Sequence, residues 1–298
     1  MDSLVDVEDH FSKQALAAPW GELGRSWTLG LVSLFSKAVV TLLNDFSIEG
    51  LDTFLQHTTA REPGVGLITV CNHTSTADDP MLFCSMLPAS FFFTEHRHLS
   101  NRWSLCAKEI CYRNALLGAF FQSGKTLPIQ RGAGTDQPIM RTVAAEVARG
   151  RWVHIFPEGK VNYTGLLGPL RWGVGKLVCD ASARSNRDPV VLPFYHTGMG
   201  QVMPRKAVVP RTGHRVHVVV GQPVELSDLT CRCNQAGEEQ RLVWRDITHR
   251  IGESLRELER RAPRNKDQVS GGRQQHEAEL HRQSEGALPE GKPGEVEE

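Results

Sequence analysis

Short apolar stretches alternate with amphipathic stretches along most of this 298-residue chain, and this alternation constrains its fold more than any other feature. The apolar stretches are typical of buried strands, and the amphipathic stretches are typical of helices that cover a sheet. The alternation predicts an α/β fold, here a single domain with a mostly parallel central sheet flanked by helices. The expected strands are residues 66–71, 126–130, 152–156, 190–194 and 216–220, and the expected helices after the first strand are residues 137–149, 170–184 and 238–261.

The loop after the first expected strand carries the strongest candidate for catalysis. It reads Asn-His-Thr-Ser-Thr-Ala-Asp-Asp-Pro over residues 72–80. A turn of this length can fold the Asp78 carboxylate back onto the His73 imidazole, which orients one ring nitrogen and leaves the other free to take a proton. Asp79 can instead begin the next helix, where an acid at the positive end is favourable. The chain has no Gly-x-Ser-x-Gly nucleophile motif, so the hydroxyl to be activated is expected to belong to a substrate.

Polar residues also follow two later strands, at the edge where open α/β sheets bind ligands. After the third expected strand, Glu158 can accept hydrogen bonds from a substrate hydroxyl, Gly159 lets the backbone approach a ligand, and Lys160 can pair with a phosphate. Arg131 closes the second expected strand and offers a bidentate contact to phosphate. Taken alone, the first group is better explained as an ordinary turn, and the alternative for Arg131 is an ordinary surface arginine. His196, after the fourth strand, is assigned a structural role.

The two ends of the chain differ in composition from its middle. Residues 267–298 carry eight acidic and three basic side chains, and the polar sequence from residue 262 onward predicts a disordered acidic tail over 262–298. Residues 1–25 are expected to be loosely ordered, so the folded domain is predicted to cover 26–261. The middle of the chain is basic, which suits an anionic partner such as lipid phosphates or gives a solvated basic surface.

Two apolar runs flank the His73 loop. Residues 26–44 place Trp27, Leu31 and other apolar side chains on one helical face, which suits a helix in a membrane interface or a helix in the core. Residues 81–93 form a second run, which suits another membrane-contact segment or a buried helix followed by a loop. Neither run is apolar over the length of about 20 residues that crossing a bilayer requires.

The sequence indicates neither a metal nor another cofactor. Cys231 and Cys233 have no second pair of ligands nearby, so a zinc site is not expected. A metallohydrolase site built on His73, Asp78 and Asp79 fits poorly, because no second histidine follows at ligand spacing. Nothing indicates a nucleic-acid partner. The cysteines that lie in apolar surroundings are predicted to be buried thiols of a reducing compartment, and they are Cys71, Cys84, Cys106, Cys111 and Cys179.

Four motifs resemble, in order, the four blocks of the glycerophospholipid acyltransferase superfamily. They are His73-x-x-x-x-Asp78, Arg131 after an apolar strand, Phe-Pro-Glu-Gly at 156–159, and an apolar strand with proline at 191–194. Within this superfamily, longer stretches resemble the tafazzin family, and the resemblance covers residues 26–260. These stretches are residues 63–73, 152–162, 171–173 and 192–199.

The resemblance implies a role for each matching residue. His73 is the base that deprotonates a lysophospholipid hydroxyl, and Asp78 orients it. The substrate-binding residues implied are Arg131, Glu158, Gly159 and Lys160. The partners implied are a phospholipid, a lysophospholipid and a membrane interface.

The resemblance leaves the acyl donor and the organelle open. Tafazzins move acyl chains between phospholipids and lysophospholipids without coenzyme A and remodel cardiolipin in mitochondria. Similar plant proteins are associated with acyl-CoA as donor and with lysophosphatidylglycerol or phosphatidylethanolamine as acceptor. A mitochondrial membrane is the expected location, with the cytosolic face of another membrane as the alternative, because the first ten residues are acidic. A non-enzymatic lipid-binding protein is a further alternative.

Overall fold

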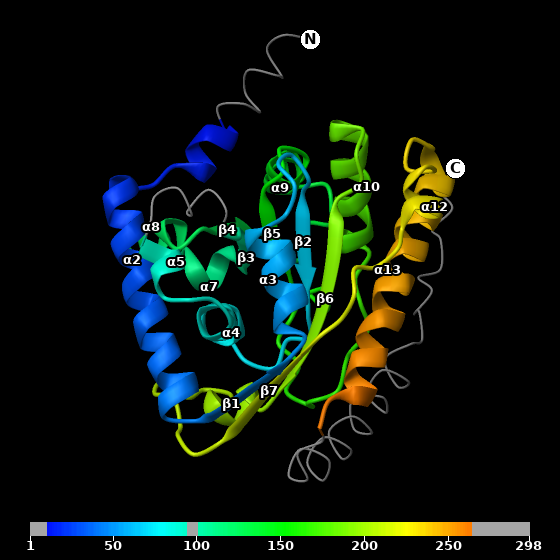
Figure 1. Cartoon of the computed structure of the whole chain (residues 1–298). Coiled ribbons are helices and arrows are strands. Elements are labelled where there is room, and N and C mark those ends of the chain that lie inside the picture. The colour runs from blue at the N-terminus through cyan, green and yellow to red at the C-terminus, as the bar shows by residue number, and fades with distance from the viewer. Residues whose placement is uncertain (1–10, 94–100, 264–298) are drawn as a thin grey trace, which may run out of the picture.

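The computed structural model describes residues 11–93 and 101–263, and at its centre is a five-stranded sheet with the order β1-β7-β6-β2-β5 (Figure 1). In this sheet β6 and β7 are antiparallel, and the other neighbouring pairs are parallel. The predicted α/β fold with a mostly parallel sheet is therefore confirmed. The strands are β1 Asp45–Glu49, β2 Leu67–Val70, β5 Trp152–Ile155, β6 Val190–Thr197 and β7 Arg215–Val220.

Helices cover both faces of this sheet (Figure 1). Successive side chains of a strand point to opposite faces, and every residue of β2 is buried. Ile68 and Val70 pack with α9, α10 and α13 on one face, whereas Leu67 and Cys71 pack with α2, α3 and α4 on the other. These helices are α2 Gly21–Lys37, α3 Leu51–Thr59, α4 Asp78–Met86, α9 Pro138–Ala148, α10 Gly173–Ser185 and α13 Gly237–Arg261.

A second sheet pairs β3 (Ser104–Ala107) with β4 (Thr126–Ile129) in parallel. It lies beside β5, because Trp103 forms a bridge with Val153. The strand expected at 126–130 therefore forms, but outside the central sheet. The remaining elements are the π-helical turn η1 Ala38–Leu42 and the short helices α5 Ser90–Phe93, α7 Lys108–Cys111, α8 Ala115–Ser123, α11 Met199–Val202 and α12 Ser227–Thr230.

The two ends of the chain are partly described. Residues 11–16 are helical and α2 begins at Gly21, within the segment 1–25 for which the sequence predicts loose order. Residues 1–10 lie outside the described residues. Helix α13 ends at Arg261, as the sequence predicts. The disordered tail predicted over 262–298 lies outside the described residues from 264 onward.

Helix α2 turns its apolar face away from the protein. Its buried side carries small and polar residues, including Ser33 and Ser36, and a Cβ at Gly30 would lie 2.1 Å from the Phe93 ring. This is the reverse of a helix that packs on a core through its apolar stripe. No helix among the described residues has both the length and the apolar character needed to cross a bilayer. The large apolar side chains exposed on α2 and the adjoining turn are Leu23, Trp27, Leu31, Leu34, Phe35, Leu42 and Leu43.

The second apolar run, residues 81–93, forms α4 and α5 and packs inward. Phe83 and Phe92 are fully buried, and Phe83 stacks near Phe54 with ring centroids 6.1 Å apart. The expected membrane contact at 81–93 is therefore contradicted, because the protein itself covers these large side chains. They fill the space between α2 and the sheet.

Two disulfides correct the prediction that the buried cysteines are thiols. Cys106 in β3 pairs with Cys111 in α7, because the strand leads directly into that helix. Cys179 in α10 pairs with Cys233, which the packing of α12 brings beside α10. Three of the five predicted thiols are thus disulfide-bonded, and Cys71 and Cys84 are buried free cysteines.

Candidate active site

Two loops meet at one edge of the central sheet. Strands β2 and β5 are adjacent and parallel, so the loops that follow them leave from the same edge. His73 lies in the first loop and Glu158 in the second, and the His73 backbone N–H donates to Glu158 Oε1 at 2.9 Å. The His73 carbonyl accepts a hydrogen bond from Asn162 N at 2.6 Å. The second loop therefore fixes the His73 backbone on both sides.

The His73 imidazole is hydrogen-bonded to Asp78, as the spacing of these residues predicts. His73 Nδ1 lies 3.0 Å from Asp78 Oδ2. Because an ionised carboxylate only accepts, Nδ1 carries the proton and Nε2 has the free lone pair. Asp78 is the first residue of α4, and its Oδ2 also accepts from the backbone of Thr74 at 2.7 Å and Ser75 at 2.8 Å. These bonds fix the carboxylate, and the carboxylate orients the ring.

A second imidazole lies close to the Asp78 carboxylate. His196 Nε2 is 3.5 Å from Asp78 Oδ2 and 3.0 Å from the carbonyl oxygen of Asn72. Burial raises the pKa of Asp78, but His196 and His73 outweigh this effect and hold the pKa well below its ordinary value. Asp78 is therefore an anion at neutral pH although it is completely buried.

The position of His196 depends on a contact that the sequence analysis missed. The Asn72 side chain accepts from His196 N and donates to His196 O, both at 2.9 Å. This pair of bonds joins the loop after β2 to the end of β6. The sequence does not reveal that β2 and β6 are neighbours. The structural role predicted for His196 therefore did not include a position near Asp78. Asn72, a polar residue directly before His73, was the one sequence signal that pointed to such a contact.

The His73 ring is held on its face as well as at Nδ1. It stacks on Phe156 with ring centroids 3.8 Å apart and an angle of 14° between the planes. The side chain is 16% exposed, so part of the ring is accessible from outside. A ring that is fixed in orientation and partly accessible can exchange a proton with a bound molecule.

Glu158 is occupied by protein donors. Besides the His73 backbone it accepts from Asn162 Nδ2 and from Gly168 N, each at 2.9 Å. Burial raises the pKa of Glu158, and these three hydrogen bonds partly offset that effect. Both carboxylate oxygens are therefore used to connect the two loops. In the structure Glu158 positions the His73 backbone, and its contact with a substrate stays a prediction.

Asp79 lies beside Asp78 in sequence but has separate partners. Its carboxylate accepts from Arg102 Nε at 2.7 Å and from Ser104 Oγ at 2.9 Å. Burial raises its pKa, and Arg102 in particular lowers it, with a net lowering. Asp79 thus ties the start of α4 to β3 and its preceding loop.

The predicted phosphate-binding residues are not all near His73. Arg131 follows β4 of the second sheet, where it is exposed and pairs with Glu109 at 3.4 Å. No contact joins it to His73 or Glu158 among the described residues. Lys160 is exposed in the Glu158 loop. Arg171, which sequence reasoning missed as a site residue, lies over Gly159: its Nε is 2.9 Å from where a Gly159 Cβ would stand.

The conformation of Gly159 allows this approach of Arg171. Gly159 has a φ of 70°, a left-handed conformation in which a side chain is strained. Arg171 N donates to Pro157 O at 2.8 Å, which fixes the arginine backbone against the loop. No ion pair of the Arg171 guanidinium is present in the described part of the chain. The exposed Arg171 guanidinium thus lies beside Gly159, the residue that follows Glu158.

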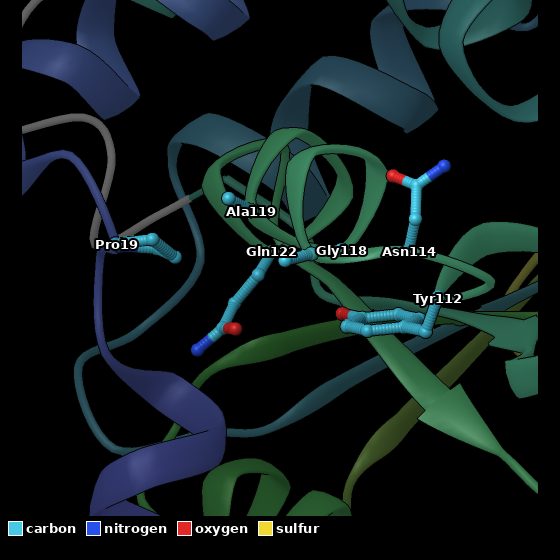
Figure 2. Close-up of a pocket in the computed structure, with 7 residues that line it drawn as sticks. Pro19, Tyr112, Asn114, Gly118, Ala119 and Gln122 are labelled. Carbon is cyan, nitrogen blue, oxygen red and sulfur yellow. The ribbon is translucent and has the colours of Figure 1, made fainter.

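The cavity drawn in Figure 2, of about 390 Å³, lies away from the His73 loop, between the segment before α2 and helix α8. None of its lining residues belongs to the site. Within the described ranges, no group of three or more His, Cys, Asp or Glu residues is arranged to hold a metal ion. The cavity is lined by Pro19, Tyr112, Asn114, Ala115, Gly118, Ala119 and Gln122.

Comparisons with known proteins match this part of the chain. Residues 49–197 match the profile of the family described as Acyltransferase. The chain is 34% identical to Tafazzin of Drosophila melanogaster over 233 residues, which cover 78% of this chain and 60% of the fly protein, so the chain spans less than two thirds of that relative.

Two further similarities extend this result. Over 212 residues the chain is 38% identical to the N-acylphosphatidylethanolamine synthase of Arabidopsis thaliana, which covers 69% of this chain and 72% of the plant protein. Among solved structures, it is similar to the 1-acyl-sn-glycerophosphate acyltransferase PlsC of Thermotoga maritima. That similarity has a TM-score of 0.47 and 17% identity, and it covers 78% of this chain and 81% of the other.

Proposed function

This chain belongs to the acyltransferase family, and from that premise we propose that it moves a fatty acyl chain from a phospholipid to a lysophospholipid, as in cardiolipin remodelling. The observation that carries the proposal is the bond between His73 Nδ1 and the buried Asp78 carboxylate. It provides an oriented base in a chain that lacks the Gly-x-Ser-x-Gly motif. The resemblance to tafazzins and the similarity to a plant N-acylphosphatidylethanolamine synthase support phospholipids as substrates.

The chemistry then needs one base and no covalent enzyme intermediate. His73 Nε2 takes the proton from the acceptor hydroxyl as its oxygen attacks the carbonyl carbon of the donor ester. The tetrahedral intermediate collapses by breaking the bond to the donor glycerol oxygen. That oxygen recovers the proton from His73 and leaves as a lysophospholipid. Asp78 remains ionised throughout and stabilises the imidazolium.

Lys160 and Arg171 are proposed to bind the lipid phosphate. Both are exposed and both lie next to the Glu158–Gly159 turn that contacts the His73 backbone. An arginine can hold phosphate through two parallel hydrogen bonds, and a lysine provides a point charge. Arg131 follows β4 of the second sheet and is paired with Glu109, so we assign it no contact with the reacting ester.

Alanine at Gly159 is expected to raise the KM for a phospholipid acceptor about tenfold or more, because a Cβ would displace Arg171 from the site. The control is Gly64→Ala, since Gly64 has a similar φ of 82° and nothing within 4 Å of its Cβ position. Both variants bear the same backbone strain of about 1–2 kcal/mol. Equal kinetics for the two variants would remove Arg171 from the proposed site.

We further propose that the exposed apolar face of α2 lies in a membrane interface. Leu23, Trp27, Leu31 and Phe35 repeat at the helical spacing that places them on one face, and each is more than half exposed. Such a face can enter the boundary between headgroups and acyl chains. A mitochondrial membrane is the proposed location, and the cytosolic face of another membrane is the alternative.

A product assay on vesicles tests the acyl donor. Labelled phosphatidylcholine and monolysocardiolipin are incubated with the protein, with and without acyl-CoA. We expect labelled cardiolipin to form at the same rate in both cases. Transfer that requires acyl-CoA would overturn the transacylase assignment while leaving His73 as the base, since both reactions attack a carbonyl in the same way.

The second candidate is the N-acylation of phosphatidylethanolamine. The identity of 38% to the Arabidopsis thaliana N-acylphosphatidylethanolamine synthase favours it. In this reaction the amine of the headgroup attacks the acyl carbonyl in place of a hydroxyl. The same vesicles, supplemented with phosphatidylethanolamine, distinguish the two, because the label then appears as an amide that resists mild alkaline hydrolysis.

A further inference from the structure

The segment between α11 and β7 exposes two valines beside a group of cations. It reads Pro-Arg-Lys-Ala-Val-Val-Pro-Arg over residues 204–211, which we call the 204–211 loop. Val208 is 89% exposed and Val209 is 73% exposed. The two adjacent valines form a small exposed apolar patch that becomes informative through the charges beside it.

The charge of the 204–211 loop is not balanced by acids. Arg205, Lys206 and Arg211 are exposed, and none of them forms an ion pair with the described residues. The sequence contains no Asp or Glu between Asp188 and Glu225. Arg205 lies over the Tyr163 ring at 5.6 Å, and this contact leaves its charge uncompensated. The loop therefore carries three exposed cations near the two exposed valines.

The C-terminal end of the loop is hydrogen-bonded to the turn that follows α2 and η1. Arg211 N donates to Val202 O at 2.7 Å, which closes the loop, and Asn44 Nδ2 donates to Arg211 O at 3.0 Å. Gly213 N donates to Leu43 O at 2.8 Å, and Leu43 is part of the exposed apolar face. Figure 1 shows the loop beside the end of α2 that leads into β1. The two apolar surfaces are therefore neighbours.

The residues just before the loop contact the His73 loop. Ser75 Oγ donates to Met203 O at 3.0 Å, and Ser75 N is one of the donors to Asp78. A Cβ at Gly200 would lie 3.4 Å from Thr74 O. Residues 200–213 thus contact the His73 loop at one end and the turn after α2 at the other, with the exposed valines between these contacts.

We infer that the 204–211 loop binds the surface of an anionic membrane, with Val208 and Val209 in the interface and the three cations on lipid phosphates. Charge complementarity selects this partner over a neutral surface, because each Lys or Arg near an anionic leaflet raises affinity by roughly fivefold. The loop thereby adds a preference for anionic lipid to the proposed attachment through α2. It also places the His73 loop close to the headgroups.

Vesicle co-sedimentation of the full chain tests this inference without any turnover. The triple variant R205Q/K206Q/R211Q is compared with the matched triple variant R232Q/R241Q/R256Q, whose residues lie on and before α13. Vesicles are phosphatidylcholine alone or phosphatidylcholine with phosphatidylglycerol, over a range of salt concentrations. Replacing these side chains leaves the backbone bonds of Arg211 in place, and thermal unfolding checks that both variants are folded.

We expect the loop variant to bind the phosphatidylglycerol vesicles at least about tenfold more weakly, with a smaller salt dependence, and to bind neutral vesicles unchanged. A V208D/V209D variant is expected to weaken binding to both kinds of vesicle. Undiminished binding by the loop variant, or an equal loss in the matched variant, would overturn the inference. Because binding is read without acyl transfer, failure of the proposed enzymatic function gives a separate result.

Discussion

Replacing His73 by alanine is expected to lower kcat for acyl transfer by about 10²–10⁴-fold, the usual contribution of a general base. The ring is the only group in the described site that combines a free nitrogen lone pair with partial exposure. Removing it leaves Asp78 and Glu158 in place, so lipid binding is expected to change little. The measurement is transfer of labelled acyl chains on vesicles, with vesicle binding determined in parallel.

The matched control is His249→Ala, because His249 is an exposed histidine of α13, with a side chain that is 67% exposed. It shares the residue type and the overall charge change but lies outside the site. We expect wild-type turnover from this control. Full acyl transfer by the His73→Ala protein would show that another group carries the proton and would remove the central element of the proposed mechanism.

The chemistry of the site was readable in the sequence because its key groups are local. His73 and Asp78 are five positions apart, and Glu158 closely follows a strand whose buried character is evident from its residues. Parallel strands place the loops that follow them at one edge, so two separate motifs could be expected to meet. The hydrogen bond from His73 N to Glu158 is the structural result of that rule.

The contacts that the sequence did not reveal are set by tertiary neighbours. His196 reaches Asp78 because β6 pairs with β2, and Arg171 reaches Gly159 because a long turn folds back on Pro157. Helical periodicity gave the apolar stripe of α2 but not its direction, since core and membrane helices share that pattern. For residues 81–93, hydrophobicity alone does not distinguish membrane contact from burial, and burial by α2 decided the outcome.

Asparagine at Asp78 is expected to reduce acyl transfer by on the order of 10³–10⁴-fold, as expected when an orienting carboxylate is lost from a histidine. An amide cannot supply the negative charge that stabilises the imidazolium, and its NH₂ group would face the donors Thr74 N and Ser75 N. The protein should also lose stability, because hydrogen bonds to a charged acceptor each contribute about 1.5–3 kcal/mol. Turnover and chemical denaturation are measured on the same preparation.

The adjacent residue provides the control. Asp79→Asn removes a buried carboxylate that pairs with Arg102, so it too should be destabilising, but Asp79 does not contact His73. We therefore expect both variants to be less stable and only Asp78→Asn to lose turnover per folded molecule. Equal turnover in the two variants would mean that Asp78 acts through stability alone.

The pH dependence of the unfolding free energy further separates the effect of Asp78→Asn on stability from its effect on turnover. The pKa of Asp78 is lower in the folded chain than the value of about 3.9 for a free aspartate. The unfolded chain therefore binds this proton first, and the stabilisation is complete above about pH 5 and is lost progressively as the pH falls below it. Asp78→Asn should remove this contribution, so its unfolding free energy should fall less steeply with acid than that of the wild type. An unchanged slope would show that the buried carboxylate is not held as an anion, and the orientation of His73 would then need another source.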